Sequence, residues 1–239
     1  GPLRTPANLD RIGRVLRAVA PLVSRSVGDT EHSRALVEQL LAPDSIREIR
    51  AQVFSPKPAG LTSVFRDDNP FYESPLAATT HFLVADSAGN IVCATQSQSL
   101  HFGAGVVPAG TGVVMNNSMS NFAYTGPAGV NYVTPGKRPR STISPSIVLR
   151  DGKPVFALGI PGASRIPTAM LQILLDRLTL NRPLAEAIGD TRMHFVPALN
   201  TTDPATIEGE RSFPAADAEA LVALGWKVVL PEEPGRGRH

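Results

Sequence analysis

Thr79 opens the segment Thr79–Asp86, in which a polar start leads directly into an apolar run typical of a β-strand. A threonine hydroxyl is a poor nucleophile unless a base accepts its proton. An N-terminal threonine carries that base itself, because a free α-amine titrates at about 7.7–8.0. Thr79 lies well inside the chain, so this chemistry requires cleavage of the peptide bond between Ala78 and Thr79.

Two stretches of different composition precede Thr79. Residues 8–54 carry apolar side chains at helical spacing, beginning with Leu9 and Ile12, and they are expected to be helical. Residues 55–78 contain scattered prolines and charged residues without apolar periodicity, which is typical of a linker or an extended surface loop. A cleavable segment needs such slack next to the bond that is cut.

After Thr79 the pattern changes to strands and then to helices. Alternating apolar residues around turn signals predict two hairpins, the second with an Asp-Gly turn, and one further strand. The predicted strands are Thr80–Asp86, Ile91–Ser97, Gly112–Asn116, Ile143–Arg150 and Pro154–Ile160. The predicted helices are Ile166–Leu178, Leu184–His194 and Pro214–Leu224. Hairpins followed by helices indicate an α+β sandwich in which helices pack on antiparallel sheets.

Three polar loop segments have the chemistry to bind or polarise a substrate. Ser141 and Thr142 place two adjacent hydroxyls before a strand, where they can bind a carboxylate. Gly162 and Ala163 lie between a strand and a helix, where backbone N–H groups can receive an oxyanion. Asn116–Phe122 is a polar cluster that can hold a polar substrate. Taken alone, each segment is more simply explained as an ordinary hydrogen-bonded turn.

Five separated motifs occur together in one order. They are Thr79-Thr80-His81, Phe102–Gly105, Asn116-Asn117, Lys137–Pro139 with Ser141, and Pro161–Arg165. With these motifs the chain resembles the γ-glutamyltransferase (γ-glutamyltranspeptidase) family of N-terminal-nucleophile hydrolases, from about Leu40 to the C-terminus. The resemblance implies a four-layer αββα fold of the α+β class. It also implies self-cleavage into a large subunit and a small subunit.

The resemblance divides the chain into two regions. Residues 1–78 would be the C-terminal helical part and linker of the large-subunit region, and residues 79–239 the small-subunit catalytic region. The chain is thus expected to be a fragment that contains most of the small subunit. It would form one domain together with the remaining large-subunit region, which is expected as a partner.

The resemblance also implies the catalytic roles. Ala78 and Thr79 would form the cleavage site, and Thr79 would be the nucleophile. Ser97 stands where the family has a threonine that hydrogen-bonds the nucleophile, and a serine hydroxyl keeps that ability. Gly162 and Ala163 match the glycine pair of the oxyanion hole. Backbone N–H groups would make those contacts, although a position with positive φ would resist alanine.

The expected substrate-binding residues depart from the family at one end. Ser141 and Thr142 match the paired serines that hold the substrate's α-carboxylate. Around the α-amino group, Ser99 replaces an asparagine, and Ser118 stands in place of glutamine or glutamate. Asn121 replaces the aspartate that pairs with the ammonium. Loss of that anion weakens the selection for a cationic group, so a donor without the amine would lose less.

Three functions remain open at this point. The first is a γ-glutamyltransferase or glutathione hydrolase-like enzyme that passes the acyl group of γ-glutamyl amides to an amino acceptor or to water. The second is an amidase of the same fold acting on glutaryl amides or poly-γ-glutamate, which a short loop at residues 123–136 and a more open cleft would suit. The third is a relative that folds but never matures.

Composition argues against several other classes. The net charge of +2 over 239 residues is too small and scattered for a nucleic-acid surface. No apolar run reaches the roughly 20 residues that span a bilayer. Cys93 is the single cysteine, so no disulfide framework or cysteine-based metal site is expected, and no cofactor is expected. The family expectation places the protein in the periplasm or outside the cell, with the cytoplasm left open.

Overall fold

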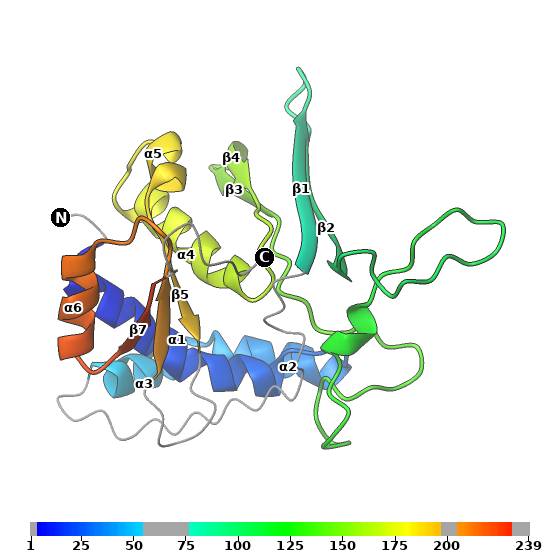
Figure 1. Ribbon diagram of the computed structural model, residues 1–239, viewed down its shortest axis with the longest axis horizontal. Coiled ribbons are helices and arrows are strands. Elements are labelled where there is room, and N and C mark those ends of the chain that lie inside the picture. The colour runs from blue at the N-terminus through cyan, green and yellow to red at the C-terminus, as the bar shows by residue number, and fades with distance from the viewer. Residues whose placement is uncertain (1–3, 55–76, 197–204, 231–239) are drawn as a thin grey trace. The chain divides into compact units, whose positions relative to one another are not determined.

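The computed structural model describes residues 4–54, 77–196 and 205–230, which contain helices and strands in two compact units (Figure 1). The described residues of the first unit are 4–54, 123–138, 171–196 and 205–230, and those of the second are 77–122 and 139–170. The predicted linker lies outside the described residues, apart from Ala77 and Ala78. The predicted division into residues 1–78 and 79–239 is defined by cleavage of the chain, not by how the chain packs. It stays a prediction.

Three helices open the first unit. They are α1 (Pro6–Ser26), α2 (Glu31–Leu40) and α3 (Pro43–Val53). Thr5 and Thr30 precede α1 and α2, and their side-chain oxygens accept the backbone N–H groups of Asn8 and Ser33 at 3.3 and 3.0 Å. Such caps satisfy N–H groups that the first turn of a helix leaves unpaired. The helical character predicted for this region is confirmed.

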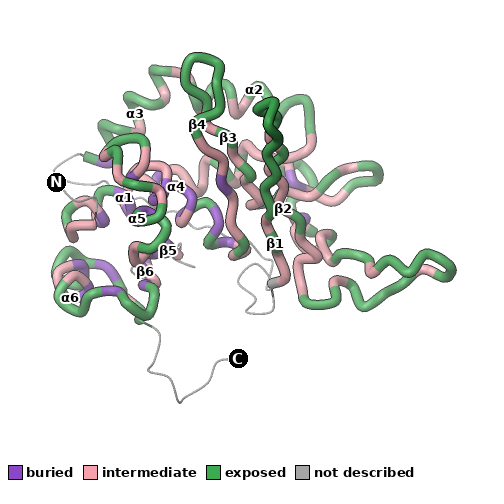
Figure 2. The backbone as a smooth tube through the Cα atoms, turned by 90° about the horizontal axis from the view of Figure 1, so that it is seen from above, coloured by how far each residue is buried: buried purple, intermediate pink, exposed green. Residues whose placement is uncertain are grey.

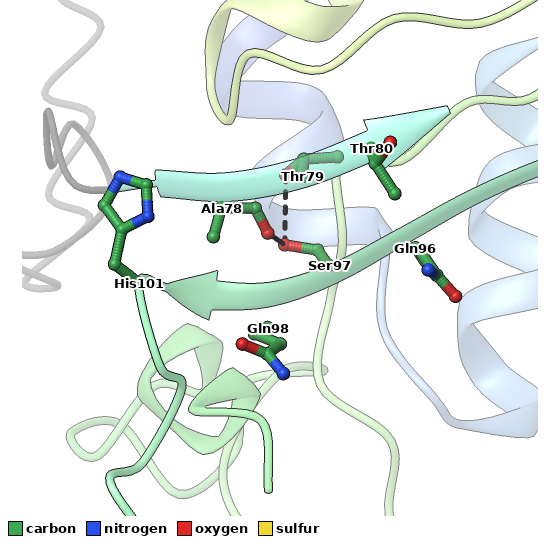
Figure 3. Close-up of a pocket in the computed structure, with 7 residues that line it drawn as sticks. All are labelled: Ala78, Thr79, Thr80, Gln96, Ser97, Gln98 and His101. Carbon is green, nitrogen blue, oxygen red and sulfur yellow. Dashed lines mark hydrogen bonds between the residues drawn. The ribbon is translucent and has the colours of Figure 1, made fainter. Parts of the chain in front are cut away.

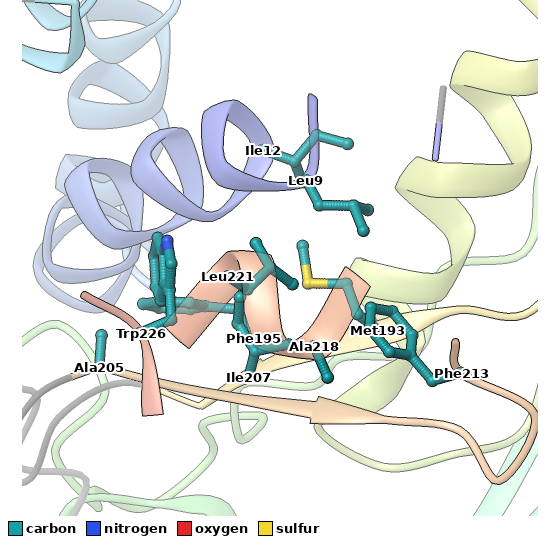
Figure 4. Close-up of a cluster of buried hydrophobic side chains, with 10 residues drawn as sticks. All are labelled: Leu9, Ile12, Met193, Phe195, Ala205, Ile207, Phe213, Ala218, Leu221 and Trp226. Atoms are coloured by element: carbon teal, nitrogen blue, oxygen red, sulfur yellow. The ribbon is translucent and has the colours of Figure 1, made fainter. Parts of the chain in front are cut away.

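The core of the first unit joins α1 to elements near the C-terminus (Figure 4). The sheet has β5 (Met193–Val196) antiparallel to β6 (Thr206–Gly209), which pairs in parallel with β7 (Lys227–Val229). The remaining helices are α4 (Arg165–Thr179), α5 (Leu184–Gly189) and α6 (Ala215–Ala223). The buried cluster contains Leu9, Ile12, Met193, Phe195, Ala205, Ile207, Phe213, Ala218, Leu221 and Trp226. Full burial of one such large side chain contributes roughly 1.5–3 kcal/mol.

Polar contacts fix the alignment of this core. Trp226 Nε1 donates to Asp10 Oδ1 at 2.9 Å, and its ring packs edge-on against Phe195 with ring centroids 5.8 Å apart. The buried Gln172 side chain of α4 donates to the carbonyl oxygen of Met193 at 2.7 Å and accepts its N–H at 3.1 Å. Both contacts satisfy polar groups that would be unfavourable to bury unpaired.

Two antiparallel hairpins form most of the second unit. They are β1 (Ala77–Ala85) with β2 (Ile91–Leu100), and β3 (Ser146–Arg150) with β4 (Lys153–Leu158). The Cys93 thiol on β2 donates to the carbonyl oxygens of Ser146 and Leu158 at 3.6 and 3.5 Å. The His81 ring lies so close to Gly159 that an added Cβ there would be 2.4 Å away. These contacts join the two predicted hairpins, whereas much of β1 is exposed (Figure 2).

The predicted strand Gly112–Asn116 is wrong, because the segment is an irregular loop. Gly110 and Gly112 have φ angles of +79° and +64°, a conformation that interrupts an extended strand. Met115 N donates to the carbonyl oxygen of Val106 at 2.9 Å, a loop contact outside any named strand. The apolar residues of this segment therefore do not form a strand, although their pattern predicted one.

The predicted helix Leu184–His194 is also wrong in its second half, because α5 ends at Gly189 and β5 begins at Met193. Arg192 N donates to Glu210 Oε2 at 2.9 Å, and β5 then pairs with β6. These partners lie far away in the sequence, so tertiary pairing overrides the local helical pattern. His194 consequently lies in a strand and is buried.

Candidate active site

Thr79 and Ser97 face each other across the hairpin of β1 and β2 (Figure 3). Thr79 Oγ1 donates to Ser97 Oγ at 3.0 Å, and Ser97 Oγ donates to the carbonyl oxygen of Ala78 at 2.9 Å. Ser97 Oγ also accepts the backbone N–H of Ser99 at 2.9 Å. Ser97 therefore links the hydroxyl predicted to be the nucleophile with the carbonyl of the bond predicted to be cut.

The pairing of the two strands changes register at this same bond. Ala78 lies opposite Ser99 and Thr79 lies opposite Ser97, so Gln98 is an additional residue on β2. Ser99 has φ = +67°, a left-handed conformation that is uncommon for a residue with a Cβ. A β-bulge bends its strand and changes the direction of its side chains. Here it coincides with the hydroxyl contact to the Ala78 carbonyl.

A cavity of about 520 Å³ lies beside the bond between Ala78 and Thr79. It is lined by Ala78, Thr79, Thr80, Gln96, Ser97, Gln98 and His101. His101 is the one ionisable side chain in this lining, and it is exposed. His101 was not predicted from the sequence, because nothing in the sequence shows that the residue after β2 lines the same cavity as Thr79. The available signal was its position shortly after Ser97.

The residues predicted around an α-amino group lie close together. Ser99 Oγ and Ser118 Oγ are 3.2 Å apart and share a hydrogen bond. Asn121 ends the same short 3₁₀ helix η1 (Ser118–Asn121) that Ser118 begins. Asn117 N donates to the carbonyl oxygen of Gln98 at 2.9 Å, which ties this turn to the bulge on β2. The structure thus brings Ser99 and Ser118 into contact and places Asn121 on the same turn.

The segment around Ser99 and Ser118 lacks the negative charge that would pair with an ammonium group. Residues 87–136 contain no Asp, Glu, Lys or Arg. Within the described part of the second unit, the carboxylates are Asp86 and Asp151, which both lie at hairpin turns. Asp86 is held by Asn90 and by backbone N–H groups of its own turn, and these hydrogen bonds lower its pKa. Hydroxyls and amides therefore replace carboxylates around Ser99.

The two hydroxyls predicted to bind a carboxylate make different contacts. Thr142 Oγ1 donates to the carbonyl oxygen of Ala163 at 2.9 Å. Ser141 Oγ accepts the backbone N–H of Ile143 at 3.2 Å, and Ser141 is exposed. Gly162 and Ala163 have φ angles of +143° and +49°, so the alanine occupies the conformation predicted to resist it. The two adjacent hydroxyls thus differ in their partners. Ser141 bonds within its own exposed loop, whereas Thr142 bonds the segment before α4.

The contacts make two groups of predicted site residues. One group contains Ala78, Thr79, Ser97, Ser99 and Ser118, which are connected by hydrogen bonds or by the chain itself. The other connects Thr142 with Ala163. Gly162 and Ala163 are not among the residues that line the cavity beside Thr79. The roles of all these residues remain predictions.

In the first unit, Arg138 holds the end of the short loop at residues 123–136. Its backbone N–H and its guanidinium donate to the two carboxylate oxygens of Asp29 at 2.8 and 2.9 Å. The side-chain hydrogen bond from Arg138 is the main cause that lowers the pKa of Asp29 to about 2. Lys137 Nζ donates to two backbone carbonyls of the loop at 2.8 and 2.9 Å. The loop is therefore pinned at its C-terminal end.

The described ranges contain neither a metal-binding cluster nor a membrane-spanning helix. No group of three or more His, Cys, Asp or Glu side chains is placed there to hold a metal ion. No helix among these residues has the length and apolar character needed to cross a membrane.

The chain is similar to several known proteins. A family model described as Gamma-glutamyltranspeptidase matches residues 3–238. The chain is 36% identical over 179 residues to the glutathione hydrolase proenzyme of Pseudomonas sp. (strain A14), covering 70% of this chain and 30% of that protein. It is 40% identical over 153 residues to the acylase ACY 1 proenzyme of Pseudomonas sp. (strain SE83), covering 64% of this chain and 26% of that protein. The crystal structure of cephalosporin acylase from Bacillus halodurans has a TM-score of 0.78 at 23% identity, covering 98% of this chain and 40% of that chain.

The crystal structure of a Helicobacter pylori γ-glutamyltranspeptidase has a TM-score of 0.55 at 31% identity, covering 64% of this chain and 84% of that chain. Together with the acylase structure, it confirms the predicted α+β, αββα fold class of N-terminal-nucleophile hydrolases. Within that class, the chain belongs to the γ-glutamyltranspeptidase family. The chain spans about 30% of the length of the first of these curated relatives and 26% of the second. Activity, substrates and partners of the whole protein are therefore matters for proposal.

Proposed function

We propose that the protein is a γ-glutamyltransferase-like enzyme that cleaves γ-glutamyl amides, such as glutathione-type donors, through an ester on Thr79. The observation that carries this proposal is the hydrogen-bond chain from Thr79 Oγ1 through Ser97 Oγ to the carbonyl oxygen of Ala78, with distances of 3.0 and 2.9 Å. A nucleophile, a proton acceptor and a carbonyl are connected at one peptide bond. Family membership and the identity to a glutathione hydrolase proenzyme add support.

The first reaction is cleavage of the chain itself. Thr79 Oγ1 attacks the carbonyl carbon of Ala78, while Ser97 Oγ accepts its proton and donates its own toward the developing oxyanion. The C–N bond breaks as the proton on the intermediate's hydroxyl passes to the Thr79 nitrogen and the carbonyl re-forms, which leaves the Ala78 acyl group as an ester on Thr79. Water then hydrolyses this ester and releases the free α-amine of Thr79.

The second reaction is turnover of the donor. The free α-amine accepts the hydroxyl proton as Thr79 Oγ1 attacks the side-chain amide of the donor. Backbone N–H groups of Gly162 and Ala163 stabilise the oxyanion, typically by about 3–4 kcal/mol for each donor. The C–N bond of the donor amide breaks as the α-ammonium of Thr79 passes its proton to the departing amine, which leaves the acyl group as an ester on Thr79. Water or an amino acceptor then takes the acyl group and restores the Thr79 hydroxyl. None of these steps needs a metal or an organic cofactor.

Two further features belong to this proposal. The remaining large-subunit region is the partner that completes the donor site. The protein works in the periplasm or outside the cell, as expected for the family.

Hydrolysis of a γ-glutamyl anilide by the full-length protein tests the proposal. Thr79→Ala should reduce the rate to background, because no other hydroxyl carries the acyl group. Thr111→Ala removes an exposed hydroxyl that donates to the carbonyl oxygen of Pro108, and it should leave the rate unchanged. Retention of wild-type activity in Thr79→Ala would overturn the proposed nucleophile.

The hydrogen bond between Ser99 and Ser118 supports a second candidate function, an amidase that prefers glutaryl amides or poly-γ-glutamate. These hydroxyls share one hydrogen bond at 3.2 Å, and residues 87–136 supply no carboxylate to pair an ammonium. An α-ammonium group desolvated without an anionic partner binds less favourably than a donor without that charge. The 40% identity to an acylase proenzyme is consistent with this candidate.

Parallel rates on γ-glutamyl and glutaryl anilides separate the two functions. Equal or better turnover of the glutaryl compound would contradict a dedicated γ-glutamyl role. Asn121→Asp should raise the preference for the γ-glutamyl donor, because it restores an anion for the ammonium. Asn181→Asp adds the same charge beside Arg177 in the first unit and serves as the control. If Asn121→Asp changes nothing, Asn121 does not contact the amine.

A further inference from the structure

Ala163 has an unfavourable backbone conformation at the position predicted to supply an oxyanion donor. Its φ of +49° lies in the left-handed region, where the Cβ of an L-residue approaches the following carbonyl oxygen. The preceding Gly162 has φ = +143°, which glycine adopts readily. An alanine keeps such a conformation only when surrounding contacts hold it.

Three hydrogen bonds hold the two peptide planes around Ala163. Arg165 N donates to the carbonyl oxygen of Gly162 at 2.9 Å, which fixes the plane containing the Ala163 N–H. Ile166 N donates to the carbonyl oxygen of Ala163 at 3.2 Å, and Thr142 Oγ1 donates to the same oxygen at 2.9 Å. Only the Thr142 contact among these three comes from outside the turn, from a residue 21 positions away. Thr142 therefore ties this turn to the strand region before β3.

The hydroxyl of Thr142 already donates to a backbone carbonyl. A threonine hydroxyl carries one proton, and a substrate carboxylate accepts hydrogen bonds without donating them. The proton of Thr142 is directed at the Ala163 carbonyl, and Ser144 Oγ donates to the carbonyl oxygen of Thr142 at 2.9 Å, which steadies the residue. Ser141 differs, because its oxygen accepts the Ile143 N–H and its proton can still be donated.

We propose that Thr142 is a positioning residue that holds Ala163 in the left-handed conformation, and that Ser141 is the member of the pair that donates to the carboxylate of the donor. The proposal rests on the proposed function, since it assigns roles to two residues of the same acyl-transfer site. Thr142 then acts on the oxyanion donor through Ala163, and it touches neither the substrate nor the reacting atoms.

Steady-state kinetics of matured full-length protein test the division of roles. Thr142→Val keeps the shape of the side chain but removes the hydroxyl, and kcat should fall roughly tenfold with KM changed less than about twofold. Thr142→Ser should restore kcat, because the hydroxyl returns. Ser141→Ala should instead raise KM several-fold with a smaller effect on kcat. Thr134→Val removes another hydroxyl that donates to a backbone carbonyl, and it serves as the matched control.

A double-mutant comparison tests whether the effect passes through Ala163. Glycine adopts positive φ without a steric penalty, so the loss of kcat caused by Thr142→Val should be smaller in an Ala163→Gly background. If Thr142→Val alone does not fold or mature, recovery in that background supports the proposal and failure to recover overturns it. An increase of KM in Thr142→Val equal to that in Ser141→Ala also overturns it.

Failure of this inference is distinguishable from failure of the proposed function. Intact mass of the wild-type protein shows whether a chain beginning at Thr79 forms, and kinetics are normalised to that chain. If the wild type matures and is active but Thr142→Val has unchanged kinetics, only the positioning role of Thr142 is contradicted. If the wild type never matures, the proposed function is contradicted, and so is the positioning role that depends on it.

Discussion

The two units of the chain are stabilised by different kinds of contact. In the first unit, Ile207 and Leu221 have no exposed surface and belong to one apolar cluster. In the second unit, Val84 on β1 and Val92 on β2 are 60% and 58% exposed, and the predicted site is held by hydrogen bonds between hydroxyls and backbone groups. Substitutions in the first unit should therefore change the free energy of unfolding, and those in the second should mainly change chemistry.

The largest expected difference between the units concerns one aliphatic side chain in each. Leu221→Ala should lower the free energy of unfolding by about 2–5 kcal/mol, because it leaves a cavity in the buried cluster. Val84→Ala should lower it by less than about 1 kcal/mol, because that side chain is largely exposed. Urea denaturation of the 239-residue variants measures both. Equal losses would mean that β1 is as well packed as the core.

A smaller effect is expected for a polar contact of the first unit. Trp226→Phe removes the hydrogen bond from Nε1 to Asp10 Oδ1 and should cost about 1–2 kcal/mol, because part of a carboxylate loses its partner. Asp10 Oδ2 also accepts Arg14 Nε at 2.8 Å, so a substitution of Asp10 would disturb two contacts at once. Urea denaturation of Trp226→Phe measures the loss, and an unchanged free energy of unfolding would contradict a stabilising contact.

In the second unit, relief of backbone strain should slightly stabilise the fold. Ala163→Gly should raise the free energy of unfolding by about 0.5 kcal/mol, because the left-handed penalty exceeds the added entropy of an unfolded glycine. Ala169→Gly within α4 is the matched control and should destabilise by about 1 kcal/mol. Thermal unfolding of both variants provides the comparison. Destabilisation by Ala163→Gly would argue against a strained alanine.

The smallest effect concerns the exposed ion pair of Asp29 with Arg138. The pKa of Asp29 is lowered from 3.8 to about 2, so the pair stabilises the fold fully above about pH 3.8 and is lost as the pH falls through 2. The stability difference between wild type and Asp29→Asn should therefore shrink between pH 4 and 2. A difference that is constant over this range would show that ionisation of Asp29 does not contribute.

Local signals in the sequence identified the elements that carry their own pattern. The hairpin that contains Thr79 and Ser97 was predictable from alternating residues and turn signals, and so was the hairpin with the Asp-Gly turn. Strand β5 was not predictable in this way, because its partner β6 and the Gln172 side chain come from distant segments. The strand conformation of β5 depends on its pairing with these distant segments.

The site shows the same limit at the level of side chains. Order and spacing of motifs indicated Thr79 and Ser97, and the structure places their hydroxyls 3.0 Å apart. The contact of Thr142 with Ala163 was not predictable, because it depends on a backbone conformation 21 residues away. His101 was missed for a similar reason, since the bulge at Gln98 determines which residues after β2 approach Ala78.

The central claim is that the bond between Ala78 and Thr79 is cut by the Thr79 hydroxyl. Intact mass spectrometry of freshly purified full-length protein tests it most directly, with Thr79→Ala as the uncut control. We expect two chains in the wild type, the second beginning at Thr79, and a single chain in the variant. A folded wild type that remains a single chain, or a Thr79→Ala protein that is cut at the same bond, would contradict it.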